Sequence, residues 1–346
     1  MLKKPLIILL SALTLAACSS DKEEAGKKPA KDENAAPVAN ENVENVMKFQ
    51  SPLTGEEMKK EPADRSVAVM VNNHPKARPQ SGLSKADIVY EVLAEGDVTR
   101  FLAIYQSRKP EEIGPIRSAR DYYIDLAKGY DSLYIAHGYS PDAKEKLDSG
   151  EIDHLNGIKY DGTLFKRADF RKAPHNSYIS FEHIQKGAKE NGFSMDTPPE
   201  PLSFLSKEES LSGEEANSIM ISYFNNPLFD VVYEYNQDEG KYERYSNGDQ
   251  TKDYGTEDPV LLENILIAET PHRIIDSAGR RDIDLQSGGN AYLIQDGKLR
   301  EVQWQNEGGR ILPYENGKQI PLGKGATWIN IIPSSPGLSG SVSYQE

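Results

Sequence analysis

Cysteine is almost absent from this sequence, since Cys18 is the only one in 346 residues. A single cysteine excludes intramolecular disulfides, zinc sites built from several cysteines, and a catalytic thiol anywhere after residue 18. What stands before Cys18 indicates its role. The chain begins with Lys3 and Lys4, continues with an apolar run over residues 6–15, and places Ala16 and Ala17 directly before the cysteine.

This pattern predicts a signal peptide at residues 1–17 that is removed on export. The apolar run is shorter than the roughly 20 residues that a membrane-spanning helix needs. We therefore expect Cys18 to carry the lipid (diacylglycerol and palmitate) of a lipoprotein, and we expect the protein on the extracytoplasmic face of the cell membrane. Two or three acyl chains supply enough buried methylene groups for stable anchoring.

Positive charge is also scarce, because 40 Lys and Arg stand against 54 Asp and Glu, a net charge of −14. Removal of residues 1–17, which contain two lysines, changes this value to −16. Nucleic-acid binding and broad adsorption to anionic lipid both need clustered positive charge, so we expect no nucleic-acid partner.

The mature chain divides by composition. Residues 18–49 contain the lipidated cysteine and a polar, mostly non-aromatic segment that predicts a disordered tether. We expect compact domains at 50–197 and 215–335, a Pro- and Ser-rich linker at 198–214 that allows them to fold separately, and a loose tail at 336–346.

The two predicted domains differ in pattern. The first has strand-like runs at 67–71, 88–92, 101–105 and 133–137 and helix-like segments at 118–128 and 181–191, which indicate an α/β or α+β domain with a mixed sheet. The second has apolar or alternating runs at 219–224, 231–235, 262–268, 291–294, 299–304 and 328–332. Asp296-Gly297 and Asn316-Gly317 are typical of tight hairpins, so we expect a mainly antiparallel β domain.

Several long phrases carry a family resemblance: residues 51–55 (SPLTG), 67–73 (VAVMVNN), 77–90 (ARPQSGLSKADIVY), 99–107 (TRFLAIYQS), 113–120 (IGPIRSAR), 172–176 (KAPHN) and 325–333 (GATWINIIP). In these phrases the chain resembles the YerB-like lipoproteins. The resemblance covers nearly all of the chain that we expect to be ordered. It implies two domains and an extracytoplasmic location, and it implies no particular reaction.

Cations concentrate in the first domain, while residues 213–333 hold 11 Lys and Arg against 20 Asp and Glu, a net of −9. Several of these cations stand at the ends of predicted elements, where loops usually build sites. We predict one concave site for an anion, such as a peptide carboxylate or a polyol phosphate, built from Asn73, Arg78, Arg100, Arg117, Arg120 and His175.

The alternative is that each arginine pairs with a nearby acid, such as Asp87, Glu91, Glu95, Asp97 or Asp121, and ties loops together. Ser118 has two interpretations as well, since it could orient a ligand or cap the helix at 118–128. We favour the cap.

The motifs of common catalytic and metal sites are missing. No two of the six histidines have the spacing of a zinc hydrolase, and no nucleophile elbow or phosphate loop is present. We therefore expect no metal and no cofactor, and we favour a module that binds an anionic envelope ligand or scaffolds an envelope-synthesis protein. A hydrolase or transferase that acts on cell-wall material is the alternative.

Overall fold

The computed structural model describes residues 49–206, 211–223 and 226–346. The predictions for the signal peptide, for Cys18 and for most of the tether lie outside these residues. These described residues form one compact unit. Among its described helices, none is long and apolar enough to cross a membrane.

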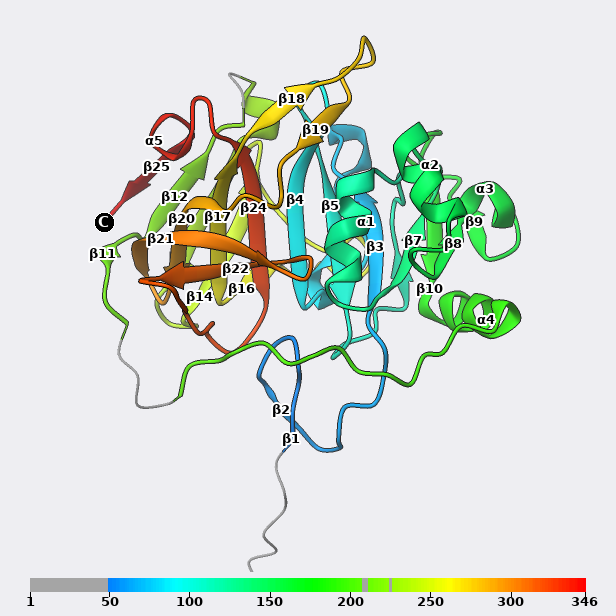
Figure 1. The fold of residues 1–346 in the computed structure, drawn as a ribbon, viewed down its shortest axis with the longest axis horizontal. Coiled ribbons are helices and arrows are strands. Elements are labelled where there is room, and N and C mark those ends of the chain that lie inside the picture. The colour runs from blue at the N-terminus through cyan, green and yellow to red at the C-terminus, as the bar shows by residue number, and fades with distance from the viewer. Residues whose placement is uncertain (1–48, 207–210, 224–225) are drawn as a thin grey trace, which may run out of the picture. The chain divides into compact units, whose positions relative to one another are not determined.

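A 12-stranded sheet runs through the whole molecule (Figure 1). Its main path is β23 (Lys318–Gln319), β22 (Arg310–Glu315), β21 (Lys298–Glu307), β20 (Gly289–Gln295), β17 (Asn264–Thr270), β24 (Thr327–Pro333), β4 (Ile88–Glu95), β5 (Val98–Tyr105), β3 (Val67–Asn72), β7 (Leu133–Ala136) and β8 (His154–Asn156), and β11 (Glu214–Glu215) pairs with β21.

We call the chain before the 198–214 connection the N-terminal segment and the chain after it the C-terminal segment. The two segments meet inside this sheet, where β4 and β24 pair in parallel from Ile88 opposite Thr327 to Val92 opposite Ile331. The connection at 198–214 therefore separates two segments of one compact unit, whereas separate folding was expected from the sequence. The reason is that β24 lies between β17 of the C-terminal segment and β4 of the N-terminal segment. The sheet is therefore continuous across the two segments, and neither segment has a free sheet edge at this point.

A second sheet packs on one face of the C-terminal half. It contains β15 (Asp249–Gln250), β14 (Lys241–Ser246), β13 (Val231–Asn236), β12 (Ser218–Ile221) and β25 (Val342–Gln345), with β16 (Leu261–Leu262) on β14. Strand β25 and helix α5 (Leu338–Ser341) belong to the tail that was expected to be loose. That expectation is wrong, because Leu338 is buried and Val342 to Gln345 pair with β12.

The other α-helices of the described residues lie in the N-terminal segment: α1 (Asp121–Lys128), α2 (Pro141–Asp148), α3 (Gly157–Tyr160) and α4 (Phe181–Asn191). Three small sheets complete the fold: β6 (Glu112–Ile113) with β10 (Ser177–Ser180) and β9 (Phe165–Arg167), β1 (Phe49–Gln50) with β2 (Glu57–Met58), and β18 (His272–Ile274) with β19 (Arg281–Ile283).

Alternation along the strands divides the core between the two faces of the sheet. In β3, Val67, Val69 and Val71 face the second sheet and α4, whereas Ala68 and Met70 face α1 and the β21–β22 hairpin. Both cores contain residues of both segments, which is the packing reason for a single unit.

The fold class expected from the sequence is confirmed: the N-terminal segment has a mixed sheet with a few helices, and the C-terminal segment is mainly antiparallel β. Asp296, Gly297, Asn316 and Gly317 all have positive φ, as tight hairpins require.

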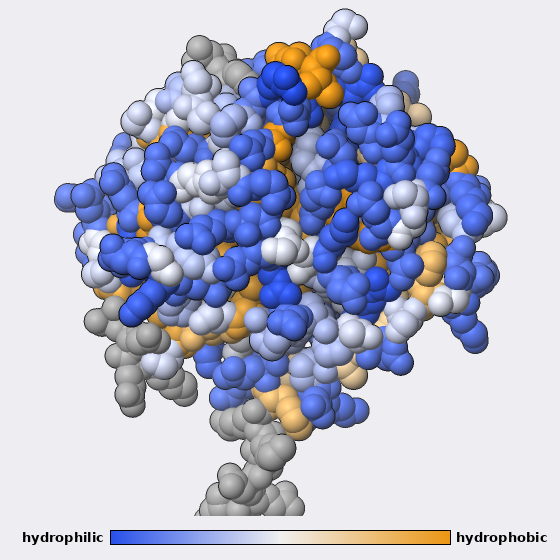
Figure 2. Space-filling model, in the orientation of Figure 1, coloured by the Kyte–Doolittle hydropathy of each residue, from blue (hydrophilic) through white to orange (hydrophobic). Residues whose placement is uncertain are grey.

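One face of the molecule is largely hydrophilic in the space-filling view (Figure 2). The apolar patch at its top lies over the β18–β19 hairpin, where Ile274 and Ile275 are exposed. On this face most other apolar side chains are inside the sheet layers.

Candidate functional site

The six predicted site residues do not form one site. Arg100 in β5 and Arg120, the residue before α1, both end on the carboxylate of Glu95 in β4. The Arg100 Nη2 to Glu95 Oε2 distance is 2.6 Å, and Arg100 Nη1 donates to the Ser118 carbonyl at 2.6 Å. Both guanidinium groups are almost fully buried. For these two residues the structure agrees with the alternative interpretation, in which arginines tie loops together.

Ser118 does not cap the helix. Its hydroxyl donates to the His137 carbonyl at 3.1 Å, and α1 begins after Arg120 without a side-chain cap. The prediction failed because the chain stays extended through 117–120, where Arg117 and Ala119 bond to β3 and Gly138.

Asn72, at the end of β3, holds two histidines side by side. Its Oδ1 accepts from the His74 backbone N–H at 3.0 Å, and its Nδ2 lies 2.8 Å from His175 Nδ1. The two imidazole rings stack with centroids 4.6 Å apart and an interplanar angle of 26°. His74 Nδ1 also accepts the N–H of Lys76 at 3.1 Å.

These contacts keep both imidazoles neutral, because each Nδ1 accepts a hydrogen bond and the ring proton then resides on Nε2. Burial, His74 and Arg117 together lower the pKa of His175 to about 4. Burial, Lys76 and Arg117 also lower the pKa of His74.

The charge of Arg117 acts on both histidines and lowers the pKa of each, and Arg117 differs from Arg100 and Arg120 in its partners. In the described part of the chain its side chain has no carboxylate within ion-pair distance and no hydrogen bond, and Lys76 and Arg171 likewise form no ion pair there. Burial and the charge of Arg100 lower the pKa of Arg117 to about 10. We call His74, Arg117 and His175 the His–Arg cluster.

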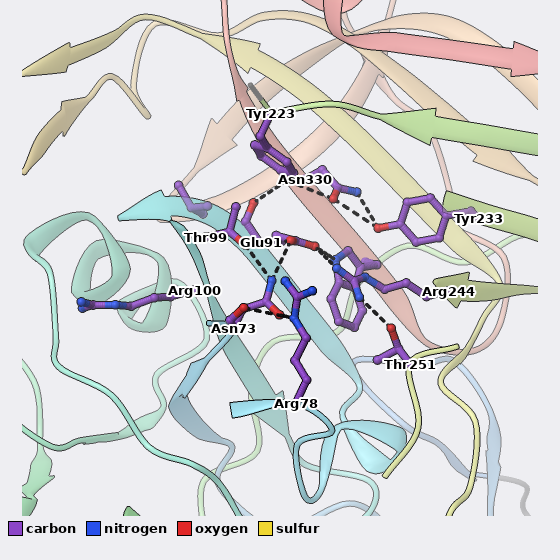
Figure 3. A network of polar contacts seen from close by, with 12 residues as sticks. Asn73, Arg78, Glu91, Thr99, Arg100, Tyr223, Tyr233, Arg244, Thr251 and Asn330 are labelled. Carbon is purple, nitrogen blue, oxygen red and sulfur yellow. Dashed lines mark hydrogen bonds and ion pairs between the residues drawn. The ribbon is translucent and has the colours of Figure 1, made fainter. Parts of the chain in front are cut away.

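Asn73 and Arg78 point into a different network, shown in Figure 3. Asn73 Oδ1 accepts from Arg78 Nε at 3.0 Å, and Asn73 Nδ2 donates to Thr99 Oγ1 at 2.8 Å and Glu91 Oε1 at 3.2 Å. Arg100 extends away from Asn73 and Arg78 in the same view. The predicted set therefore divides into three places.

Glu91 of β4 is the centre of that network. It is fully buried, and its Oε2 accepts from Arg244 Nη2 of β14 at 2.8 Å and from Trp328 Nε1 of β24 at 3.1 Å. The Arg244 guanidinium stacks over Trp328 at 4.7 Å and is 1% exposed. Burial alone would lower the pKa of Arg244, but the Glu91 carboxylate raises it. We call Glu91, Arg244 and Trp328 the seam network, because it joins the two segments.

From the sequence, Glu91 was considered only as a possible partner of an arginine, although its position carries a stronger signal. Glu91 stands within the apolar run 88–92, in phase with Val89 and Leu93, which face the second sheet. A carboxylate at such a position needs a buried partner. Arg244 was missed because it stands on an alternating strand in the acidic segment, where nothing local marks it.

The His–Arg cluster combines positive charge with N–H donors, a set suited to carboxylate or phosphate oxygens. Among the described residues, no group of three or more His, Cys, Asp or Glu is arranged to hold a metal ion.

Comparison with known proteins identifies the family. The models described as "Protein of unknown function (DUF3048) N-terminal domain" and "Protein of unknown function (DUF3048) C-terminal domain" match residues 53–194 and 219–329. The chain belongs to the DUF3048 family. The two matched ranges lie on either side of the 198–214 connection.

A relative and a solved structure support this membership. The chain is 48% identical over 292 residues to "Putative lipoprotein YerB" of Bacillus subtilis strain 168, a match that covers 84% of this chain and 88% of the relative. It is also similar to the crystal structure of the YerB protein from Bacillus subtilis, with a TM-score of 0.80, 48% identity and coverage of 86% of this chain and 99% of the other. The resemblance to YerB-like lipoproteins is thus confirmed.

Proposed function

We propose that this DUF3048 protein is a lipoprotein, anchored by Cys18 on the extracytoplasmic face of the cell membrane, that binds an anionic group of the cell envelope at its His–Arg cluster. Two facts support the anchor: the signal peptide and cysteine pattern of residues 1–18, and the name of the 48% identical relative, a putative lipoprotein. The observation that carries the binding site is Arg117, which forms no ion pair with any described residue and whose charge acts on two stacked histidines, in a chain of net charge −14.

The cluster offers donors to an oxyanion. The guanidinium of Arg117 can present two parallel N–H groups, and the neutral rings of His74 and His175 each carry a proton on Nε2. Lys76 and Arg171 add positive potential, since both lower the pKa of His175. A phosphate or carboxylate here would supply the negative charge that the described protein residues do not.

Glycerol 3-phosphate is a suitable probe for this site because it combines a phosphate with a small polyol. We expect Arg117→Ala to weaken its binding roughly tenfold or more, as the loss of a charged hydrogen bond predicts. Isothermal titration calorimetry on the full-length protein in detergent measures this change.

Arg167→Ala is the matched control, since it removes one arginine that is exposed and already paired with Asp161 at 2.8 Å. If both substitutions weaken binding equally, the effect reflects net charge and not a site. If glycerol 3-phosphate and inorganic phosphate both fail to bind the wild type, the proposal is wrong.

The anchor has its own test. Cys18→Ala should remove labelled palmitate and release the protein from the membrane fraction, because no other anchor is predicted from the sequence. Cell fractionation and a high-salt wash measure the release. A Cys18→Ala protein that stays in the washed membranes would contradict the lipoprotein assignment.

A further inference from the structure

A cavity of about 320 Å³ lies between the two segments, and none of the three residues of the His–Arg cluster lines it. The loop after β3 forms one wall, and β14, β15 and the residues around them form the other. Its lining residues that enter the argument are Pro75, Arg78, Pro79, Arg244, Ser246 and Asp249. Cavities of roughly this size hold small organic ligands in proteins.

Arg78 and Ser246 both line this cavity, and each has a buried side-chain atom without a hydrogen-bond partner among the described residues. Arg78 Nε donates to Asn73 Oδ1 at 3.0 Å and Nη1 donates to the Leu228 carbonyl at 3.0 Å, which holds the guanidinium in place. Arg78 Nη2 is buried and has no partner among the described residues, and the same holds for Ser246 Oγ, on a side chain that is 5% exposed. Buried polar groups are almost always hydrogen-bonded, so two such groups in one cavity indicate a ligand that accepts from them.

The charges at the cavity favour a single negative charge on that ligand. The guanidinium of Arg244 is neutralised by Glu91, at 2.8 Å. Arg78 forms no ion pair within the described ranges, and burial together with the charge of Arg244 lowers its pKa to about 10. Asp249 and Lys252, which also line the cavity, offset each other. One positive charge therefore remains, which matches a singly charged carboxylate better than a doubly charged phosphate.

The other walls suit a small apolar body. Pro75 and Pro79 line the same cavity and present ring carbons without an N–H donor. A ligand with an oxyanion at one end and a few carbons behind it would match both parts of the lining.

We propose that this cavity, the seam pocket, binds the carboxylate of a small ligand with a short apolar body, such as the C-terminal end of a short peptide. Arg78 Nη2 and the Ser246 hydroxyl donate to the two carboxylate oxygens. Because the walls come from both segments, the bound ligand bridges them. This site does not depend on the proposed function, since the His–Arg cluster contributes none of its residues.

The experiment compares N-acetyl-alanyl-alanine with its C-terminal amide, which has the same body without the charge. Calorimetry on the full-length protein in detergent should show that the free acid binds at least about tenfold more tightly than the amide. Arg78→Gln should weaken binding of the acid roughly tenfold or more. Ser246→Ala should weaken it by a smaller factor.

Arg117→Gln is the control from the other site and should leave the affinity for the acid unchanged. Ser246→Ala also keeps the test decisive if Arg78→Gln fails to fold, because the serine hydroxyl has no protein partner to lose. Equal affinities for acid and amide, or no binding of either, overturn the proposal.

Two further outcomes also overturn it. If methyl phosphate competes for the pocket more strongly than the acid does, the carboxylate assignment is wrong. If Arg117→Gln abolishes binding of the acid while Arg78→Gln does not, the seam pocket is not the site, although the proposed function stands.

Discussion

Two kinds of arginine occur in this molecule, and carboxylates distinguish them. Arg100, Arg120 and Arg244 are buried and form ion pairs with Glu95 or Glu91. Arg78 and Arg117 are partly buried and form no ion pair in the described residues, and the pKa of each is lowered to about 10, first by burial. The first kind stabilises the fold, whereas the second is the kind that we propose for ligand binding. Position at the end of a strand or helix does not separate the two kinds.

The largest effect should come from breaking the seam network. Glu91→Gln leaves Arg244 buried without its carboxylate, so we expect the free energy of unfolding to fall by about 3 to 5 kcal/mol. Urea denaturation measures the change. The double variant Glu91→Gln with Arg244→Met removes the stranded charge and should recover part of the loss. If Glu91→Gln changes the free energy of unfolding by less than about 1 kcal/mol, Arg244 does not belong to the structural kind.

A smaller effect is expected at Glu95, which is partly exposed. Glu95→Gln removes the charge that Arg100 and Arg120 share, and the unpaired donors should cost about 1 to 3 kcal/mol of the free energy of unfolding. Asp161→Asn is the matched control, because it breaks the exposed pair with Arg167 and should cost less than about 1 kcal/mol. Equal losses at the two positions would contradict the role assigned to Glu95.

Arg117→Ala should have almost no effect on stability, although it removes the same type of side chain. Without a carboxylate partner to strand, we expect the free energy of unfolding to stay within about 0.5 kcal/mol of the wild type. Thermal and urea unfolding check this result. A loss as large as that of Glu95→Gln would place Arg117 with the structural arginines and remove the main support for the anion site.

The last stability prediction concerns pH. The pKa of His175 is lowered from 6.5 to about 4, so the folded state binds fewer protons than the unfolded state in this range. Its contribution to stability is therefore present above about pH 6.5 and is lost as the pH falls towards 4. His175→Gln should reduce the fall in the free energy of unfolding between pH 7 and pH 5.

His272 is a built-in control for the same measurement, because burial lowers its pKa to about 4 as well. Bound glycerol 3-phosphate should raise the pKa of His175, since an anion favours the protonated ring, and should leave that of His272 unchanged. Proton NMR titration of the two ring signals follows both values. Parallel shifts at His175 and His272 would indicate a general effect of ionic strength.

By itself, the sequence determined the local elements and the membership. Strands β3, β4 and β5 and helix α4 lie where the apolar runs predicted them, and the Asp-Gly and Asn-Gly pairs form tight turns, because these patterns depend on neighbours only a few residues apart. The long phrases at 67–73 and 113–120 carried the family resemblance that the comparisons confirm.

Only the tertiary structure decided which charges meet. Glu91 and Arg244 are 153 positions apart, and β24 joins the two segments through a strand pairing that no local pattern announces. Arg100, Arg117 and Arg120 have similar surroundings in sequence, yet one carboxylate, Glu95, holds two of them and leaves the third. Ion pairing depends on distances of a few ångströms in space. Residues far apart in the chain can come within that distance once a sheet has formed, and their positions in the sequence do not reveal it.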